Sequence, residues 1–199
     1  MTNIYNKRHK NMTLRERKLI NMVLQHEGGY SFVKNDAGME TYCGISRRYN
    51  PQWKGWILID RYKPLKHNQK VNDPQLIELV DSFYFNTYCE PLKMTRIENV
   101  FIAGHLICHC VNAGIKTGVK MLQKAINNVY GTNISVDGVI GNTTLSYVNG
   151  NRQNEVATEF IRLRNNYYNE IVRNKPAQRV FLKGWLNRVK NTTAFCRNI

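Results

Sequence analysis

Two carboxylates near the start of the chain have the types and spacing that cleavage of a glycosidic bond needs. Glu27 is followed by Gly28 and Gly29, and Asp36 comes nine residues after Glu27. Such cleavage requires a carboxylic acid that protonates the leaving oxygen, and a second group that handles water or the developing cation. The two glycines allow a sharp backbone turn and leave room for a bulky sugar. The spacing therefore indicates Glu27 as the acid and Asp36 as its partner.

The spacing alone leaves an alternative open for each acid. Glu27 would then be a solvated residue before a turn, and Asp36 would belong to an ordinary Asn-Asp turn. Glu40, between Met39 and Thr41, is predicted to be an exposed charge on a hairpin.

A helix must position Glu27. Residues 13–26 have apolar side chains near the 3.6-residue period and begin with a capping-box pattern, and the glycine pair ends the helix. Glu27 is thus expected at a helix C-terminus, where the helix dipole disfavours an ionised carboxylate. Partial burial behind Tyr30 and Tyr42 would disfavour the charge further.

The rest of the chain reads mostly as helix. Residues 30–46 lack a helical period and combine aromatic and Thr residues with glycines, which predicts a small irregular β-hairpin region. Residues 50–56 are predicted to form a loop, followed by a short apolar run at 57–59. Further helices are predicted over 73–88, 97–111, 116–129, a short segment from 142, 156–171 and 181–189.

The composition indicates a globular protein with an anionic partner. The net charge is +15, from 29 Lys and Arg against 14 Asp and Glu. Nucleic acid, an acidic membrane surface and the bacterial wall all attract such a charge. No stretch approaches the roughly 18 apolar residues of a membrane span. The polar start lacks the apolar core of a secretory signal peptide, so synthesis in a cytoplasm is expected.

Several segments occur in an order that is typical of one family. Glu27 to Tyr30, Asn35-Asp36 and Thr41 to Ser46 follow one another near the start. This order resembles the N-terminal motif of the N-acetylmuramidases of glycoside hydrolase family 108, and its Glu, Asp, Thr order is similar to that of phage-type lysozymes. Later, "CVNAG" and "LQKAINNVYGTNISVDGVIGNTTL" resemble that family's Asn-x-Gly segment and its peptidoglycan-binding half. The resemblance extends over about residues 13–190.

The resemblance implies a fold and a set of roles. The fold would be mostly α, a lysozyme-like α+β arrangement with a small N-terminal β-hairpin region and a helical C-terminal lobe. Glu27 would be the general acid, while Asp36 and Thr41 would place the water. Neither a metal nor a cofactor is expected. Substrate contacts are expected from Tyr30, Tyr42 and Asn112.

The same resemblance implies a domain organisation and a biological setting. Residues 1–12 would be a flexible basic tail, residues 13–110 the muramidase domain and residues 111–199 a helical peptidoglycan-binding domain packed against it. Bacterial peptidoglycan would be the partner of a monomer, with neither nucleic acid bound nor stable membrane insertion. The enzyme would be made in a bacterial cytoplasm and would act in the periplasm or wall after holin-type release, as a phage endolysin, or after dedicated export, as a secretion muramidase.

The cysteines and histidines offer another chemistry. His105, Cys108, His109 and Cys110 suggest zinc, but Cys108 and Cys110 point about 200° apart on a helix and cannot share one tetrahedral site. A Cys–His nucleophile would lack a third group to orient it. Five cysteines at irregular spacing do not form a disulfide framework. We therefore expect reduced, buried cysteines along an apolar helix.

Two arginine pairs, Arg47-Arg48 and Arg162 with Arg164, are predicted to be solvated and to favour an anionic wall collectively.

The leading hypothesis is a muramidase that cleaves the β-1,4 bond between N-acetylmuramic acid and N-acetylglucosamine. A lytic transglycosylase, which needs only one acid, is an alternative. A non-catalytic wall-binding protein is a second, because Ala37 and Met39 depart from the family pattern beside Asp36. A nucleic-acid-binding protein is a third, motivated by charge alone, since no helix-turn-helix or zinc pattern is readable.

Overall fold

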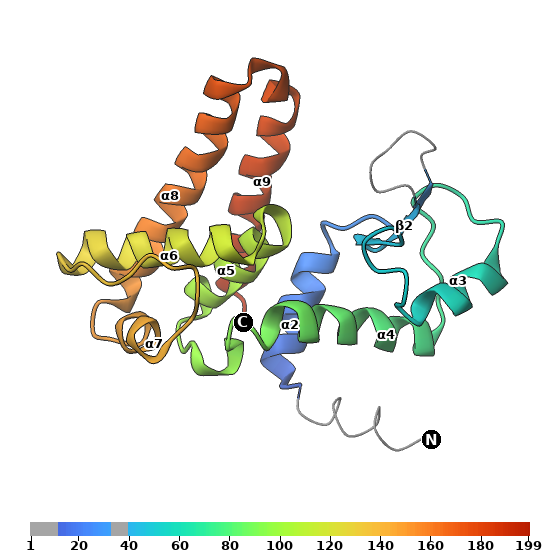
Figure 1. Cartoon of the computed structure of the whole chain (residues 1–199), viewed down its shortest axis with the longest axis horizontal. Coiled ribbons are helices and arrows are strands. Elements are labelled where there is room, and N and C mark those ends of the chain that lie inside the picture. The colour runs from blue at the N-terminus through green and yellow to red at the C-terminus, as the bar shows by residue number, and fades with distance from the viewer. Residues whose placement is uncertain (1–11, 33–39) are drawn as a thin grey trace. The chain divides into compact units, whose positions relative to one another are not determined.

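The structure, a computed structural model (Figure 1), describes residues 12–32 and 40–199. The predicted basic tail, apart from Met12, and Asp36 with its loop lie outside the described residues. The chain forms two compact units. The N-terminal unit holds residues 20–86, and the C-terminal unit holds residues 13–19 with 87–199. The domain boundary expected between residues 110 and 111 stays a prediction.

Helix α2 (Leu14–Leu24) begins with the predicted capping box. The Thr13 backbone N–H donates to the Glu16 carboxylate at 2.9 Å, and the Glu16 N–H donates to the Thr13 hydroxyl at 3.2 Å. The apolar side chains in the middle of the helix, Leu19 and Ile20 among them, are fully buried. The helix ends two residues before the predicted end, and a bend carries the chain to Glu27.

A three-stranded antiparallel sheet follows, in the order β1-β2-β3. Its strands are β1 (Tyr30–Phe32), β2 (Glu40–Tyr42) and β3 (Ile45–Ser46). Tyr42 lies opposite both Tyr30 and Ile45, so the β2–β3 connection has only two residues, Cys43 and Gly44. Both have positive φ, 47° and 76°, as a type I′ hairpin turn requires. The predicted β-hairpin region is confirmed.

Two helices complete the N-terminal unit: α3 (Gly55–Tyr62) and α4 (Pro74–Tyr84). The predicted loop over residues 50–56 and short run 57–59 are wrong at their ends, because Gly55 already begins α3. Asp73 caps α4 by accepting from the N–H groups of Gln75 and Leu76, with Pro74 in the first turn. The helix continues as one π-helical turn, Phe85–Cys89.

The C-terminal unit is helical throughout its ordered elements. They are a short 3₁₀ turn (Met94–Arg96), α5 (Val100–Ala113), α6 (Ile115–Tyr130), α7 (Asn142–Val148), α8 (Gln153–Asn174), a 3₁₀ turn (Pro176–Gln178) and α9 (Arg179–Cys196). Helix α5, the most apolar, packs against α6, α8 and α9. Figure 1 shows α8 and α9 side by side as an antiparallel pair.

The core of the C-terminal unit contains an unexpected polar group. Arg164 on α8 is 0% exposed and hydrogen-bonds His105 on α5, whose other ring nitrogen lies 3.1 Å from the Thr193 hydroxyl. The prediction that Arg164 is solvated is therefore wrong. It failed because Arg164 lies four residues after the buried Phe160 and four before the buried Tyr168, on the inward face of α8.

All five cysteines are buried and free, so the prediction of reduced cysteines along an apolar helix is confirmed for Cys108 and Cys110 on α5. Within residues 12–32 and 40–199, no group of three His, Cys, Asp or Glu side chains is placed to hold a metal ion. Among the helices formed by these same residues, none combines the length and the apolar character needed to cross a bilayer.

Candidate active site

The Glu27 carboxylate lies against the turn that joins β2 and β3. A Cβ atom built on Gly44 would be 2.7 Å from Glu27 Oε2 and 2.7 Å from the Tyr84 hydroxyl. The hydroxyl of Tyr84, at the end of α4, donates to the carbonyl of Cys43 at 2.8 Å. Glu27 is half-buried, which leaves part of the side chain open to a substrate. The bend after α2 thus places the predicted acid against the hairpin turn and the end of α4.

The glycine pair after Glu27 supports the loop over residues 66–70. Gly29 N–H donates to Asn68 Oδ1 at 2.8 Å, and Tyr30 exchanges backbone hydrogen bonds with this loop, its N–H to Gln69 at 2.8 Å and its carbonyl from Asn68 at 2.6 Å. A Cβ on Gly29 would lie 2.3 Å from the Gln69 carbonyl oxygen and 2.5 Å from that of Asn68. Gly29 is required by this close backbone approach, whereas Gly28 is exposed.

Thr41 lies in the middle of β2. Its cross-strand neighbours are Ser31 on β1 and Ser46 on β3, so three hydroxyl side chains share one face of the sheet. Thr41 is half-buried. This face is opposite to the one that carries Glu40 and Tyr42, because side chains alternate along a strand.

The two tyrosines that were predicted to contact substrate are largely covered. Tyr42 is 3% exposed, and its hydroxyl accepts from the Val71 N–H at 3.0 Å. Burial raises the pKa of Tyr42 to about 12. Tyr30 is 9% exposed, and burial, followed by a hydrogen bond to Glu40, raises its pKa. In this structure both phenols stay neutral and hold neighbouring segments in place.

Glu40 corrects an expectation. Instead of being an exposed hairpin charge, it is 7% exposed and forms ion pairs with Arg47 at 2.7 Å and with Lys63 at 2.7 Å. Asp60 joins the same cluster at 2.7 Å from Arg47 and 2.8 Å from Lys63. Hydrogen bonds from these two cations lower the pKa of Asp60 to about 2.

Arg47 is correspondingly engaged by two carboxylates and is not a purely solvated charge, and its guanidinium lies 4.6 Å from the centre of the Trp56 ring. The burial of Glu40 could have been predicted from β2. Alternate side chains of a strand share one face, so Glu40 lies on the same face as Tyr42.

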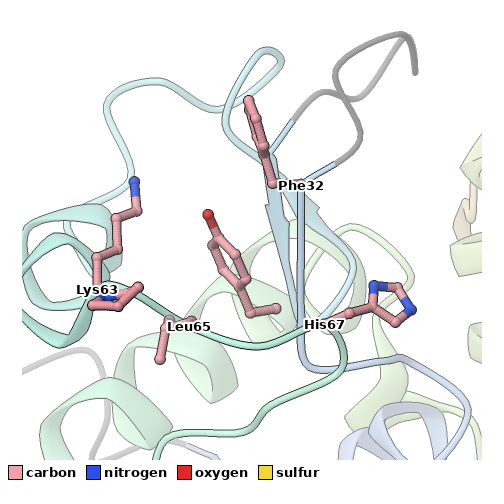
Figure 2. Close-up of a pocket in the computed structure, with 6 residues that line it drawn as sticks. Phe32, Lys63, Leu65 and His67 are labelled. Carbon is pink, nitrogen blue, oxygen red and sulfur yellow. The ribbon is translucent and has the colours of Figure 1, made fainter.

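A pocket of about 600 Å³ opens beside β1 (Figure 2). Phe32 stands on β1, while Lys63, Leu65 and His67 come from the segment between α3 and α4. Phe32 is 56% exposed. The pocket combines aromatic, apolar and cationic groups on the N-terminal unit, but Lys63 is already engaged by two carboxylates.

Two further predicted site residues lie outside the described part of the N-terminal unit. Asp36 lies outside the described residues. Asn112 belongs to the C-terminal unit, in the last turn of α5, where its Oδ1 accepts from the Tyr168 hydroxyl at 3.0 Å. Sequence reasoning missed Gly44 and Tyr84, whose contacts with the Glu27 region depend on segments distant in sequence.

Comparison with known proteins divides the chain into two matching parts. Residues 20–114 match the family described as Glycosyl hydrolase 108, and residues 117–190 match one described as "Predicted Peptidoglycan domain". The fold is similar to that of SagA from Brucella abortus, with a TM-score of 0.62 at 21% identity over 92% of this chain and 94% of that chain. No curated protein matches the sequence. The likeness confirms a mostly α, lysozyme-like fold with a small sheet.

Proposed function

We infer that this chain is a glycoside hydrolase that acts on peptidoglycan, because residues 20–114 match the Glycosyl hydrolase 108 family and residues 117–190 match the family described as "Predicted Peptidoglycan domain". From this premise we propose that it is an N-acetylmuramidase, which cleaves the β-1,4 bond between N-acetylmuramic acid and N-acetylglucosamine. The observation that supports this best is the half-buried Glu27 carboxylate held against the Cys43–Gly44 turn.

In the proposed reaction Glu27 is the general acid. Its carboxyl proton passes to the glycosidic oxygen as the bond from that oxygen to C1 of N-acetylmuramic acid breaks. A water molecule attacks C1, and its proton passes to Asp36, the partner that the sequence motif indicates. Thr41 would help to hold this water through its hydroxyl. The products are a reducing N-acetylmuramic acid end and a free 4-hydroxyl on N-acetylglucosamine, with inversion at C1 if the water attacks directly.

The decisive experiment is digestion of purified sacculi by the wild-type chain and by Glu27→Gln. We expect soluble muropeptides with reducing N-acetylmuramic acid from the wild type, identified by mass spectrometry. Glu27→Gln keeps the size of the side chain but cannot donate the proton, so the rate should fall at least about 100-fold. Glu78→Gln, which changes an exposed glutamate of the same unit, serves as the matched control and should remain active. Wild-type-like activity of Glu27→Gln would reject Glu27 as the acid.

The same digest separates the alternatives. A 1,6-anhydro product would identify a lytic transglycosylase, in which the 6-hydroxyl of the sugar replaces water. Sacculus binding without any released fragment would identify a non-catalytic wall-binding protein. Asp36→Asn and Thr41→Val test the water-handling roles, because a hydrolase needs them and a transglycosylase does not.

A further inference from the structure

The C-terminal unit has a pocket of about 510 Å³ where α8 ends and α9 begins. Its volume lies within the range of about 300–1,000 Å³ that is usual for small-molecule sites. The side chains that line it and could contact a ligand are Tyr167, Glu170, Asn174, Lys175, Gln178 and Trp185. All of them fall within residues 117–190, the segment matched by the peptidoglycan domain family. None belongs to the site around Glu27.

The Trp185 ring that lines this pocket packs against two other aromatic rings. The Trp185 ring stacks on the buried Tyr168 ring, with centroids 5.3 Å apart and planes at 23°. Phe181, one turn earlier on α9, lies 5.9 Å from the same indole. Trp185 and Tyr167 are both half-buried, so each still presents part of its ring to the pocket. A ligand would not have to order these rings on binding, which lowers the entropic cost.

The polar rim of the pocket can both donate and accept hydrogen bonds. Asn174 and Gln178 bring side-chain amides, each with two donors and an acceptor. In the part of the chain that the structure describes, these two amides make no hydrogen bond to other protein groups. Glu170 and Lys175 add one carboxylate and one ammonium. Because Lys175 and Arg173, whose guanidinium lies 3.8 Å from the Glu170 carboxylate, offset the charge of Glu170, the two amides are left as the main uncharged hydrogen-bonding groups of the rim, and a neutral ligand rich in hydroxyl and amide groups matches them.

From these features we infer that the pocket binds an N-acetylated amino sugar of the glycan strand. The C–H face of a pyranose ring packs on an aromatic ring, while its hydroxyl and acetamido groups bond with amides and carboxylates. The inference rests on the proposed function, since it names where the C-terminal unit holds the polymer that Glu27 would cleave. Such a site would keep the chain on the wall between successive cleavages.

Binding is tested apart from cleavage by using the Glu27→Gln background, in which the wall stays intact. Sacculus co-sedimentation is measured for this chain and for the same chain with Trp185→Ala or Asn174→Ala. Each second change should weaken binding at least about tenfold, equivalent to about 1.4 kcal/mol. Asn191→Ala, an exposed asparagine on α9 outside the pocket, is the matched control and should bind as before. Thermal unfolding identifies any variant that has lost its fold, and Asn174→Ala, at an exposed position, is expected to keep it.

A soluble probe locates the site and identifies its ligand. The tetramer of N-acetylglucosamine, added to a Trp53→Phe, Trp56→Phe double variant in which Trp185 is the remaining tryptophan, should change the indole fluorescence in a saturable way. No fluorescence change together with unaltered sacculus binding by the pocket variants would overturn the inference, even if the wild type still releases muropeptides. Binding that disappears when an amidase strips the stem peptides would also overturn it, in favour of a peptide ligand. Failure of the wild type to cleave sacculi would instead reject the proposed function.

Discussion

The position of the Glu27 carboxylate depends on Gly44, which lies outside the segment around Glu27. Gly44, in the turn between β2 and β3, has no side chain, and a Cβ there would lie 2.7 Å from both the Glu27 carboxylate and the Tyr84 hydroxyl. The turn alone explains why this residue has a positive φ of 76°. The contact with Glu27 and Tyr84 adds a second requirement, because it leaves no room for a Cβ. The β2–β3 turn and Tyr84 therefore help to position the acid, together with the end of α2.

Gly44→Ala tests this positioning. The new methyl group would displace the carboxylate or the tyrosine, and a shift of about 1 Å at a catalytic group can cost about 100-fold in rate. We expect kcat on sacculi or soluble glycan fragments to fall by at least about tenfold while the chain still folds. The measurement is steady-state release of reducing ends, alongside urea unfolding.

Gly131→Ala provides the matched control for the backbone strain. Gly131 also has positive φ, 62°, but a Cβ there would meet nothing within 4 Å. Each variant should lose about 1 kcal/mol of unfolding free energy for the left-handed conformation, and Gly44→Ala should lose more because its Cβ also meets Glu27 and Tyr84 at 2.7 Å. Equal loss of activity in the two variants would show that strain, and not the displacement of Glu27, is responsible.

The candidate site could be predicted from sequence only where its residues share one local motif. Glu27 and Thr41 come from such a motif, and the structure puts both in the N-terminal unit. The β2–β3 turn and α4 bring Gly44 and Tyr84 to Glu27, so these contacts cannot be predicted from the spacing of residues along the chain. Glu40 was misjudged because its partners, Arg47 and Lys63, are brought to it by the sheet and by the end of α3.

At the scale of elements, the loop over residues 66–70 binds the segment between Glu27 and β1 through hydrogen bonds. Three hydrogen bonds join this loop to Gly29 and Tyr30. The loop can come this close only because Gly29 has no Cβ. The conformation of the chain beside the acid is therefore set by a segment about forty residues further along.

Gly29→Ala should break this arrangement. A Cβ at 2.3 Å from a carbonyl oxygen forces the loop backbone away and weakens the three hydrogen bonds. We expect the free energy of unfolding to fall by about 1–3 kcal/mol, the usual cost of overpacking. The neighbouring Gly28→Ala is the control, because its Cβ would meet only the tip of the Asn68 side chain, at 3.0 Å. Urea unfolding in which Gly28→Ala costs as much as Gly29→Ala would contradict this explanation.

The helices were predictable wherever an amphipathic period extended over three turns or more. α2, α4, α5, α6, α8 and α9 all occur where the sequence predicts them, with most ends shifted by a few residues, although α9 continues to Cys196, well beyond the predicted end at 189. The start of α3 was missed because Gly55 and Trp56 belong to the segment 50–56, which the sequence predicts to be a loop. The start of α3 is fixed by contacts outside the helix, among them the hydrogen bond from the Trp56 indole to the Asn50 carbonyl at 2.8 Å and that from the Trp53 indole to the Leu79 carbonyl at 3.3 Å.

At the scale of the whole molecule, buried histidines link stability to pH. Burial, followed by the charge of Arg164, lowers the pKa of His105 to about 2 and that of His109 to about 3. Both are therefore neutral in the folded chain at pH 5, whereas in the unfolded chain they titrate near their usual pKa of about 6.5. Because the folded-state pKa values are the lower ones, the unfolded chain binds more protons as the pH falls below about 6.5.

The free energy of unfolding should consequently decrease between pH 7 and pH 5, by about 2 kcal/mol for each buried histidine. Urea unfolding at the two pH values measures this change. His109→Gln should remove about half of it, whatever the variant does to stability at pH 7. His67→Gln, at an exposed histidine, should leave the change as it is in the wild type. A pH dependence that persists unchanged in His109→Gln would show that other groups cause it.

The burial of all five cysteines makes this protein well suited to site-specific labelling. Burial raises the pKa of the Cys110 thiol to about 12 and that of Cys196 to about 11, so neither forms the reactive thiolate at neutral pH. A single cysteine introduced at an exposed position, such as Tyr49 or Lys183, would be the preferred target of a maleimide dye without removal of any native thiol. A variant that carries one such cysteine on each unit could be labelled with a donor and an acceptor, which would report on the separation of the units as the chain meets the wall.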